Sequence, residues 1–443
     1  MGWGDLPSYG HPTIETPVID RLVQGGQRWT NFYSAASLCT PSRAAMLTGR
    51  LPIRSGMGGF HEDRRNLFPT SSGGLPHSEV TIAEMLKEKG YATQALGKWH
   101  LGHLPRYLPP RHGFDSYLGI PYSNDMNAVG GWKLETFFKP PNIEYWDVPL
   151  IQDEEIIERP ANQHTITRRY TERAVEFIRE NKDQPFFLYF AQTMPHTPLF
   201  AAERFLGTSK RGLYGDVIAE IDWSIGEVIS TLEELDVHEN TFVIVASDNG
   251  PWLTMLQHGG TAGHLRDGKA TTWDGGMRVP AIFYWPGVVE PGVISDLGST
   301  LDFLPTIAGF TGANPPDDRK LDGYDLRPVL TEKKPSPRQE MFFYRLHEVY
   351  AARKGPFKAH FMTAAFFTSN STREVHDPPL LFNMNVDPSE QYNIAADHPD
   401  VIEEIRAMVR EHESTVEPVE HMLELYPEGA EDPDRPWKEG ATE

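Results

Sequence analysis

The stretch Cys39-Thr40-Pro41-Ser42-Arg43-Ala44-Ala45-Met46-Leu47-Thr48-Gly49-Arg50 carries the strongest local signal in the chain. Its order predicts a helix, because Thr40 can cap the start, Pro41 suits the first helical position and Gly49 suits the end. Cys39 then lies just before the free amides of a helix N-terminus, which stabilise an anion. A lone cysteine is more often a small buried residue, and position alone does not decide between the two interpretations.

Helical and strand patterns alternate on the C-terminal side of this stretch, which indicates an α/β layer fold. The expected helix–strand pairs are 81–90 with 92–96, 165–180 with 186–190, and 217–235 with 241–246, followed by a strand over 280–285. Polar residues follow three of the strands, namely Lys98 with His100, then His196, then Asp248 with Asn249. Ligands bind at the carboxyl ends of parallel strands, so we expect these side chains to share one cleft.

The pattern changes near residues 335–337. Short apolar runs over 341–344, 350–352, 358–363 and 380–382 indicate an antiparallel sheet, and a helix is expected over 399–411. The sequence therefore predicts two domains, a catalytic α/β domain over 1–335 and a smaller α+β domain over 336–443 that ends in an acidic tail.

Composition excludes several classes of protein. The formal charge of −21 argues against nucleic-acid binding, and any site for an anion must supply its own local positive charge. One cysteine excludes an internal disulfide and a cysteine-rich zinc site. No run approaches the ~20 apolar residues of a membrane helix, and the start shows no signal-peptide pattern. The cellular compartment stays open.

Several segments together resemble the sulfatase family. Besides the Cys39 stretch they are Gly97-Lys98-Trp99-His100-Leu101-Gly102, His112-Gly113-Phe114, Asp248-Asn249-Gly250, Gly268-Lys269 with Asp274-Gly275-Gly276, and Asp387-Pro388 with Tyr392-Asn393. Their order is the family's order, and the similarity is greatest to the arylsulfatase A and N-acetylgalactosamine-6-sulfatase branch. The resemblance implies an alkaline-phosphatase-like, mostly parallel sheet between helices, with an antiparallel sheet in the smaller C-terminal domain.

The resemblance also implies a chemistry for Cys39. In the family this cysteine is converted to formylglycine by a maturation enzyme, and the aldehyde hydrates to a diol. One hydroxyl attacks sulfur and releases the alcohol, and the second hydroxyl then expels sulfate. Asp248, Asn249 and the modified residue 39 are the implied ligands of a divalent metal, Ca²⁺ or Mg²⁺. An isolated Asp-Asn-Gly is more commonly a turn.

Further roles follow from the same resemblance. The implied catalytic residues are Cys39, Arg43, Lys98, His100, His196 and Lys269, and the implied sulfate contacts are Lys98, Ser123, His196 and Lys269. His100 would assist the formylglycine, Arg43 would hold it in register with the metal, and His196 or Lys269 would protonate the leaving group. Ser123 fits an ordinary turn serine equally well.

The chain departs from the family pattern at its start. Sulfatases usually begin with an apolar strand ending in two metal-binding aspartates, and Met1 occupies the position just after that pair. Asp5 matches a later aspartate that is not a ligand. We therefore expect the strand and both aspartates to be absent, through a late start or a shortened isoform. We also expect the 443-residue chain to bind metal poorly and to hydrolyse sulfate esters weakly or not at all.

Other functions remain open from the sequence. A phosphate or phosphonate ester hydrolase of the same superfamily would share the sheet and the metal cleft, and a non-catalytic relative would bind sulfated glycans or partner subunits. The precise substrate and the oligomeric state, including a homo-oligomer, are not readable. His103, His258 and His264 are expected at the pocket rim or the surface, and Asn370-Ser371-Thr372 fits a glycosylation pattern that often occurs by chance.

Overall fold

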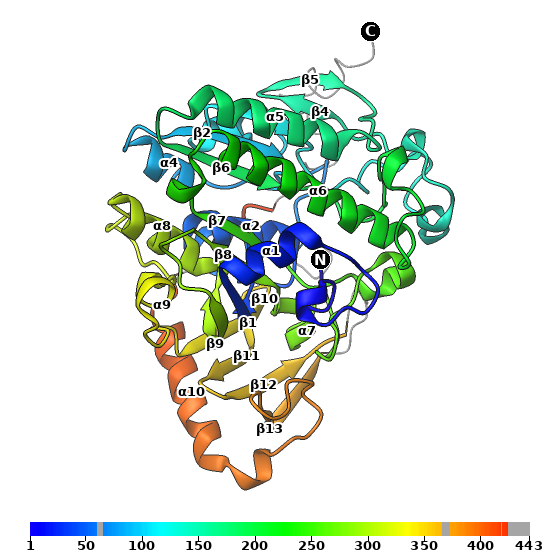
Figure 1. Ribbon diagram of the computed structural model, residues 1–443. Helices are drawn as coiled ribbons and strands as arrows, with labels where there is room; N and C mark the ends of the chain where they lie inside the picture. Colours follow the sequence, from blue (N-terminus) through cyan, green and yellow to red (C-terminus); the bar gives the residue numbers. More distant parts are fainter. Residues whose placement is uncertain (60–64, 366–372, 418, 424–443) are drawn as a thin grey trace.

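A computed structural model of the chain describes residues 1–59, 65–365, 373–417 and 419–423. Three sheets organise it (Figure 1). The glycosylation pattern at 370–372 and most of the acidic tail lie outside the described residues.

The first sheet has five strands in the order β5 (Glu155–Glu158), β4 (Leu150–Gln152), β3 (Ser116–Gly119), β2 (Ala92–Gly97) and β6 (Phe186–Ala191). β2 runs parallel to both of its neighbours, β3 and β6, whereas β4 pairs antiparallel with β3 and β5. The carboxyl ends of β2 and β6 therefore meet at one edge of the sheet.

The second sheet has four strands in the order β7 (Val243–Ala246), β8 (Ala281–Tyr284), β1 (Gln27–Tyr33) and β9 (Gly292–Ser299). β1 and β9 are parallel, and β8 runs antiparallel to β1 and β7. The strands expected over 241–246 and 280–285 are thus present, each slightly shorter than the apolar run that predicted it.

The two sheets do not join within the described residues. A cavity of about 880 Å³ lies between β6 and β7, and its lining includes every residue of both strands. Side chains of β6 and β7 are half-buried throughout, although their apolar sequences are typical of central strands. The expected sheet is therefore divided, and the edges of β6 and β7 that face the cavity carry backbone groups without a strand partner in the described part of the chain.

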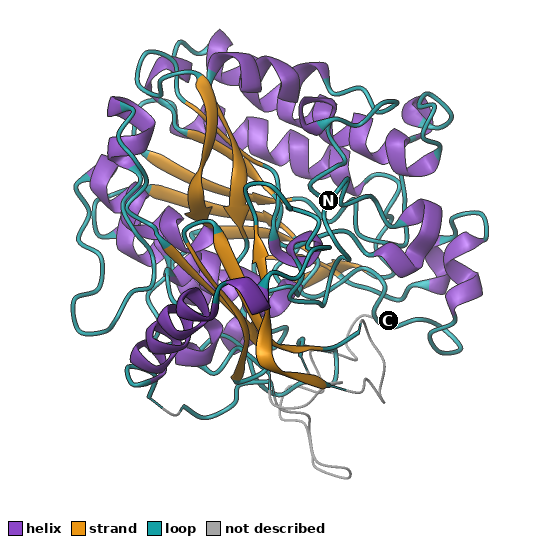
Figure 2. Ribbon diagram, turned by 90° about the horizontal axis from the view of Figure 1, so that it is seen from below, coloured by secondary structure: helices purple, strands orange, loops and turns teal. Residues whose placement is uncertain are grey.

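Helices cover both sides of these sheets (Figure 2). They are α1 (Pro17–Gly25), α2 (Cys39–Thr48), α3 (Pro52–Ser55), α4 (Ile82–Lys87), α5 (Ile166–Asn181), α6 (Leu213–Glu234), α7 (Asp274–Met277), α8 (Phe303–Thr311) and α9 (Arg327–Glu332). The capping box at the start of α4 is confirmed, since the Thr81 hydroxyl accepts from the Glu84 N–H and the Glu84 carboxylate accepts from the Thr81 N–H.

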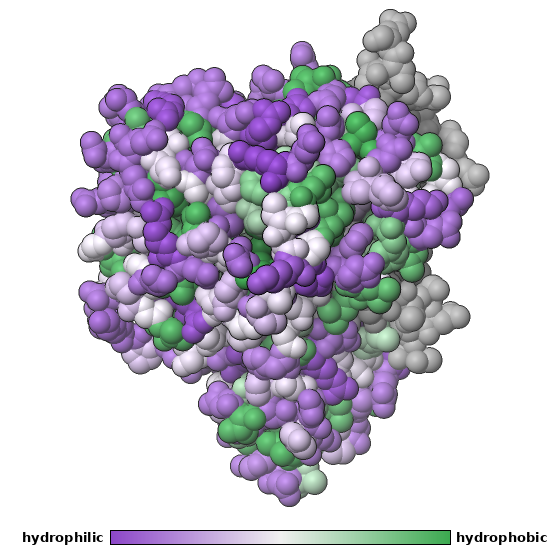
Figure 3. All heavy atoms as spheres, turned by 45° about the vertical axis from the view of Figure 1, so that its right-hand side comes forward, coloured by the Kyte–Doolittle hydropathy of each residue, from purple (hydrophilic) through white to green (hydrophobic). Residues whose placement is uncertain are grey.

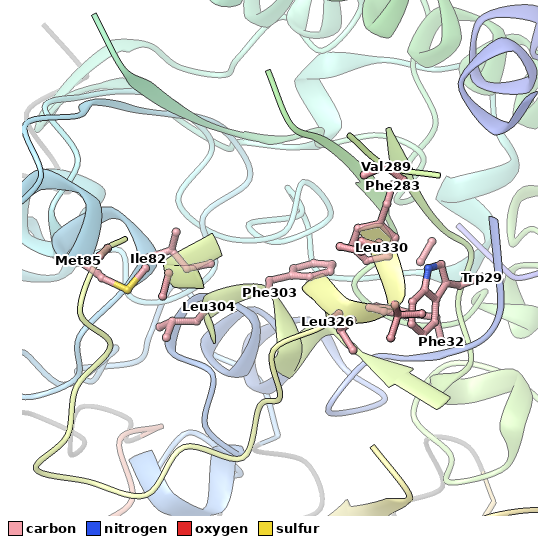
Figure 4. Packing of buried hydrophobic residues seen from close by; sticks show 14 of the residues in the cluster. Trp29, Phe32, Ile82, Met85, Phe283, Val289, Phe303, Leu304, Leu326 and Leu330 are labelled. Atoms are coloured by element: carbon pink, nitrogen blue, oxygen red, sulfur yellow. The ribbon is translucent and has the colours of Figure 1, made fainter. Parts of the chain in front are cut away.

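Aromatic rings fill one core cluster beside the second sheet (Figure 4). Phe32 of β1 packs on Phe283 of β8 at 5.6 Å and on Phe303 of α8 at 5.7 Å between ring centroids. Trp29 lies against the rings of Phe32 and Phe283 and is fully buried. The cluster fixes α8 against β1, and α8 and the turn before it contact α2, the helix that begins at Cys39.

The C-terminal sheet is antiparallel throughout, in the order β10 (Glu340–Arg345), β11 (Glu348–Lys354), β12 (Phe357–Thr363) and β13 (Glu374–Asn383). With α10 (Pro399–Glu413) it forms the lower part of the molecule in Figure 1, as expected for this region. Hydrophilic residues dominate the face in Figure 3, with small apolar patches between them. Within the described ranges, no helix combines the length and apolarity needed to span a bilayer.

Candidate active site

Three strand ends and one helix start meet at a single place. Lys98 and His100 follow β2, His196 follows β6, Asp248 and Asn249 follow β7, and Cys39 begins α2. Lys269 reaches the same place from the segment between β7 and β8. The structure thus brings together side chains that lie up to 230 residues apart in the sequence, at the carboxyl ends of the strands.

Cys39 is the first residue of α2, and its side chain is 2% exposed. The prediction that Thr40 caps this helix is wrong. Leu38 occupies the cap position without a side-chain hydrogen bond. The Thr40 hydroxyl instead donates to the His100 carbonyl at 3.0 Å and accepts from the Leu67 N–H at 3.1 Å. Thr40 therefore joins the start of α2 to the segment that follows β2.

Arg43 lies one turn into α2 and ties this helix to two strand ends. Its Nε donates to Asp248 Oδ2 at 3.0 Å, and its Nη2 forms an ion pair with the same oxygen at 2.9 Å. Its Nη1 donates to the Lys98 carbonyl at 2.6 Å and lies 3.4 Å from the Tyr189 hydroxyl of β6. Such a planar fork holds two groups at fixed positions, which a flexible ammonium does not.

A line of polar side chains runs beside Cys39. Lys98 Nζ donates to Ser123 Oγ at 3.0 Å, and Ser123 Oγ lies 3.2 Å from His196 Nε2. His196 Nε2 in turn lies 3.0 Å from Lys269 Nζ, which sits 5.0 Å from the centre of the Trp252 ring. Ser123 is thus part of the cluster, in contact with two of the other three predicted sulfate contacts.

His100 is buried next to this line. Its backbone has the left-handed φ of 65°, and its Nε2 lies 2.9 Å from the Leu67 carbonyl. Burial lowers the pKa of His100 well below its ordinary value, and the positive charge of Lys98 lowers it further. The imidazole is therefore neutral at neutral pH, and its buried Nδ1 has no hydrogen-bond partner among the described residues.

Positive charge dominates the site, despite the acidic protein around it. Burial alone would raise the pKa of Cys39, but Lys269 and Lys98 lower it below its ordinary value. Burial would also raise the pKa of Asp248, yet Arg43 above all brings it far below the usual range. Lys98, Lys269 and Arg43 thus place three positive charges around Cys39 and Asp248, which makes the pocket suited to an anion such as a sulfate group.

Asp248 and Asn249 are the predicted metal ligands from protein side chains. They lie side by side after β7, and Asn249 Nδ2 approaches the Cys39 sulfur to 3.6 Å. Their oxygens fit a hard divalent cation in chemical type. Their number is small, because the described residues contain no group of three His, Cys, Asp or Glu side chains that could hold a metal. Asp5 accepts from the Gly2 and Thr261 N–H groups and from the Tyr214 hydroxyl.

Two residues of the site were not predicted. Asn124 Oδ1 lies 3.1 Å from His196 Nδ1, and Asp125 Oδ1 lies 3.9 Å from the same nitrogen. Burial raises the pKa of Asp125, while Lys269 and Lys98 oppose that shift. Their position directly after Ser123 was the one available signal.

The three histidines expected at the rim or surface divide. His264 is exposed, and His258 is half-buried and lines the cavity. His103 is buried, with 3% exposure, so its predicted position is wrong. Its ring centroid lies 5.9 Å from that of Tyr122. The flanking residues in the sequence, Gly102 and Leu104, did not indicate that His103 would be buried.

Two family models match the chain. A family model described as Sulfatase matches residues 1–313, and one described as the C-terminal region of aryl-sulfatase matches residues 336–438. The chain belongs to the sulfatase family and is an enzyme that hydrolyses sulfate esters. Membership implies, in general terms, a metal and a formylglycine.

Individual relatives agree with this assignment. The chain is 41% identical to arylsulfatase A of Homo sapiens over 438 residues, 92% of this chain and 85% of the relative. It is 38% identical to N-acetylgalactosamine-6-sulfatase of Homo sapiens over 461 residues, 96% and 86% of the two chains. The PsFucS1 sulfatase from Pseudoalteromonas sp. superposes with a TM-score of 0.81 at 27% identity, covering 95% and 90%. The expected alkaline-phosphatase-like fold is confirmed.

Proposed function

We propose that this sulfatase cleaves sulfate esters of aryl or sugar alcohols at residue 39. The observation that carries the proposal is the position of Cys39. It is buried at the start of α2 and surrounded by Lys98, Lys269 and Arg43, whose charges favour an anion there. The relatives of the chain include an arylsulfatase and an amino-sugar sulfatase, which supports both aryl and sugar sulfate esters as substrates.

Cys39 would act after conversion to formylglycine by a maturation enzyme, and Ca²⁺, or alternatively Mg²⁺, would be held by Asp248, Asn249 and the modified residue 39. The aldehyde hydrate supplies a nucleophile with two hydroxyls, and the metal supplies a Lewis acid toward a sulfate oxygen. Two side-chain oxygens and one modified residue make a sparse coordination shell.

The remaining residues bind the substrate and move a proton. Lys98, Ser123, His196 and Lys269 would contact the sulfate group, since their polar atoms form one connected line beside Cys39. His196 Nε2 or Lys269 Nζ would deliver a proton to the leaving oxygen. Burial and the Lys269 charge lower the pKa of His196 well below its ordinary value, which favours Lys269 as the proton donor at neutral pH.

His100 and Arg43 would act on the nucleophile itself. Burial and the charge of Lys98 keep the His100 imidazole neutral, so it is able to accept a proton from a hydroxyl at residue 39. Arg43 keeps Asp248 in place through one hydrogen bond and one ion-pair contact, and so holds the metal side of the site in register with α2.

The experiment uses the 443-residue chain, produced in a host that contains the maturation machinery. Mass spectrometry of the Cys39 peptide should show the aldehyde in place of the thiol. Hydrolysis of an aryl sulfate should exceed that of the matching aryl phosphate, and calcium should raise the rate after chelation. Cys39→Ala should abolish hydrolysis, and equal activity of that variant would reject residue 39 as the nucleophile.

A further inference from the structure

Lys269 lies on a segment that belongs to none of the three sheets. This Lys269 loop, residues 266–276, leads from the site toward β8 and contains part of the single-turn helix α7. The Lys269 N–H donates to the Pro251 carbonyl at 2.9 Å, and the N–H of Ala270, at a left-handed φ of 73°, donates to the Ser37 carbonyl at 2.9 Å. These bonds fix the loop on the side of the active site. Its opposite side faces the C-terminal sheet.

Lys358 of β12 reaches across from the C-terminal sheet into this loop. Its ammonium group is fully buried and donates to the Thr272 carbonyl and to Asp274 Oδ1, each at 2.9 Å. The same ammonium lies 2.9 Å from Glu390 Oε1. One cation from the C-terminal domain therefore contacts both the backbone and a carboxylate of the loop that carries Lys269.

Glu390, which follows β13, holds the loop at two further points. Its Oε2 accepts from the Asp274 N–H at 2.7 Å, and its backbone carbonyl accepts from Arg266 Nη1 at 2.7 Å. Its Oε1 lies 2.7 Å from His360 Nε2, next to Lys358 on β12. Both ends of the Lys269 loop are thereby attached to residues of the C-terminal domain.

The charges of this cluster depend on one another. Burial alone would raise the pKa of Asp274, but Lys358 above all, followed by Arg278 and Arg353, brings it far below the usual range. The carboxylates of Asp274 and Glu390 share the Lys358 ammonium in a site closed to water. Removal of the ammonium would leave two buried carboxylates without their shared cation, although Arg278 still lies 3.3 Å from Asp274 Oδ2, and we expect the loop that carries Asp274 to shift.

We propose that Lys358 and Glu390 are positioning residues that hold Lys269 at the active site, so that the C-terminal sheet sets the geometry of the sulfate pocket. The inference rests on the proposed function for the role of Lys269. It goes beyond that function, because neither residue touches Cys39, the predicted metal ligands or the predicted sulfate contacts. We call the contacts of Lys358 and Glu390 with the Lys269 loop the clamp. The clamp affects the site through the 3.0 Å contact between Lys269 Nζ and His196 Nε2.

The test follows His196, whose imidazole reports the distance of the Lys269 charge without need of turnover. Lys358→Met keeps the length of the side chain and removes its charge. With Lys269 displaced, we expect the His196 imidazole nitrogen resonances to shift and the pKa of His196 to rise by about 0.5 or more in an NMR titration. Glu390→Gln, a milder change, should move both quantities in the same direction and covers the case in which Lys358→Met does not fold.

A double-mutant cycle separates positioning from general damage. In a Lys269→Ala background, Lys358→Met should cause no further shift at His196, because the charge that it positions is already gone. Arg338→Met is the matched control. It removes another buried cation of the C-terminal domain, 2.5 Å from Asp302 Oδ1, and should lower stability without moving His196.

Two results would overturn the clamp: unchanged His196 resonances in both Lys358→Met and Glu390→Gln, or an equal shift with and without Lys269. A failure of the proposed function would look different. Lys269→Ala would then retain sulfate-ester hydrolysis, whatever the His196 titration reports.

Discussion

Arg43 illustrates how much of the site depends on single side-chain shapes. It makes one hydrogen bond and one ion-pair contact to Asp248 and one hydrogen bond to the Lys98 carbonyl, from a position 6% exposed. We predict that Arg43→Lys lowers kcat/KM for an aryl sulfate by about 100-fold, because a single ammonium cannot hold both partners in place. Initial rates on material with the modified residue 39 measure the effect.

The control for this substitution is Arg21→Lys on α1. Arg21 forms an exposed ion pair with Glu233 at 3.5 Å, and such pairs contribute little. Its kcat/KM should match that of the unchanged enzyme. If Arg43→Lys also kept more than half of the original rate, the fork geometry would have no part in catalysis.

Single residues also mark the limit of sequence reasoning at the site. Cys39, Lys98, His196, Asp248 and Lys269 were predictable because each stands in a short recognisable segment, and the structure brings them together. Asn124 and Asp125 were not, since their roles arise from His196, which is remote in the chain. Thr40 misled because its hydroxyl accepts from the Leu67 N–H, and not from an N–H of its own helix, and donates to the His100 carbonyl.

At the scale of elements, helix α6 carries a buried carboxyl group, Glu220, whose ionisation lowers the stability of the protein. Glu220 is 2% exposed, and its Oε2 accepts from the Ala202 N–H at 2.9 Å, while its buried Oε1 has no hydrogen-bond partner in the part of the chain that the structure describes. Burial raises the pKa of Glu220 to about 7. Its folded-state pKa exceeds the unfolded one, so the native protein binds the proton more tightly. The cost of ionising Glu220 is thus absent at acidic pH and grows up to about pH 7.

We therefore predict that Glu220→Gln changes the pH dependence of stability. Between pH 5 and pH 8 the free energy of unfolding should fall by about 2 kcal/mol more in the unchanged protein than in the variant. Urea unfolding at the two pH values measures this difference. Glu234→Gln, at an exposed position on the same helix, should leave the pH dependence unchanged. Parallel pH profiles for the protein and Glu220→Gln would contradict the prediction.

The elements themselves were largely predictable, and their pairing was not. The capping pair at Thr81, the helical stripe of α6 and the apolar runs of β2, β6 and β7 each state their structure locally. β8 runs antiparallel to its neighbours β1 and β7, and this direction depends on where the chain enters the sheet after the Lys269 loop. Local periodicity carries no information about that edge.

For the molecule as a whole, the division of the central sheet matters most. β2 has a hydrogen-bonded strand on each side, as has β1 in the second sheet. β6 and β7 are paired on one side each, and their other edges face the 880 Å³ cavity that reaches Asp248 and Lys269. The apolar sequences of β6 and β7 are typical of central strands, because composition records burial potential and not the presence of a neighbour.

This asymmetry predicts an uneven pattern of hydrogen exchange. Alternate amides of β6 and β7 point away from their paired neighbour and toward the cavity, where no strand of the described chain accepts them. In native-state exchange followed by NMR, we expect these amides to exchange at least about 100-fold faster than those of β2 and β1, which are held from both sides. Slow exchange of every β6 and β7 amide, equal to that of β2, would mean that the two edges are covered in solution and that the sheet is continuous there.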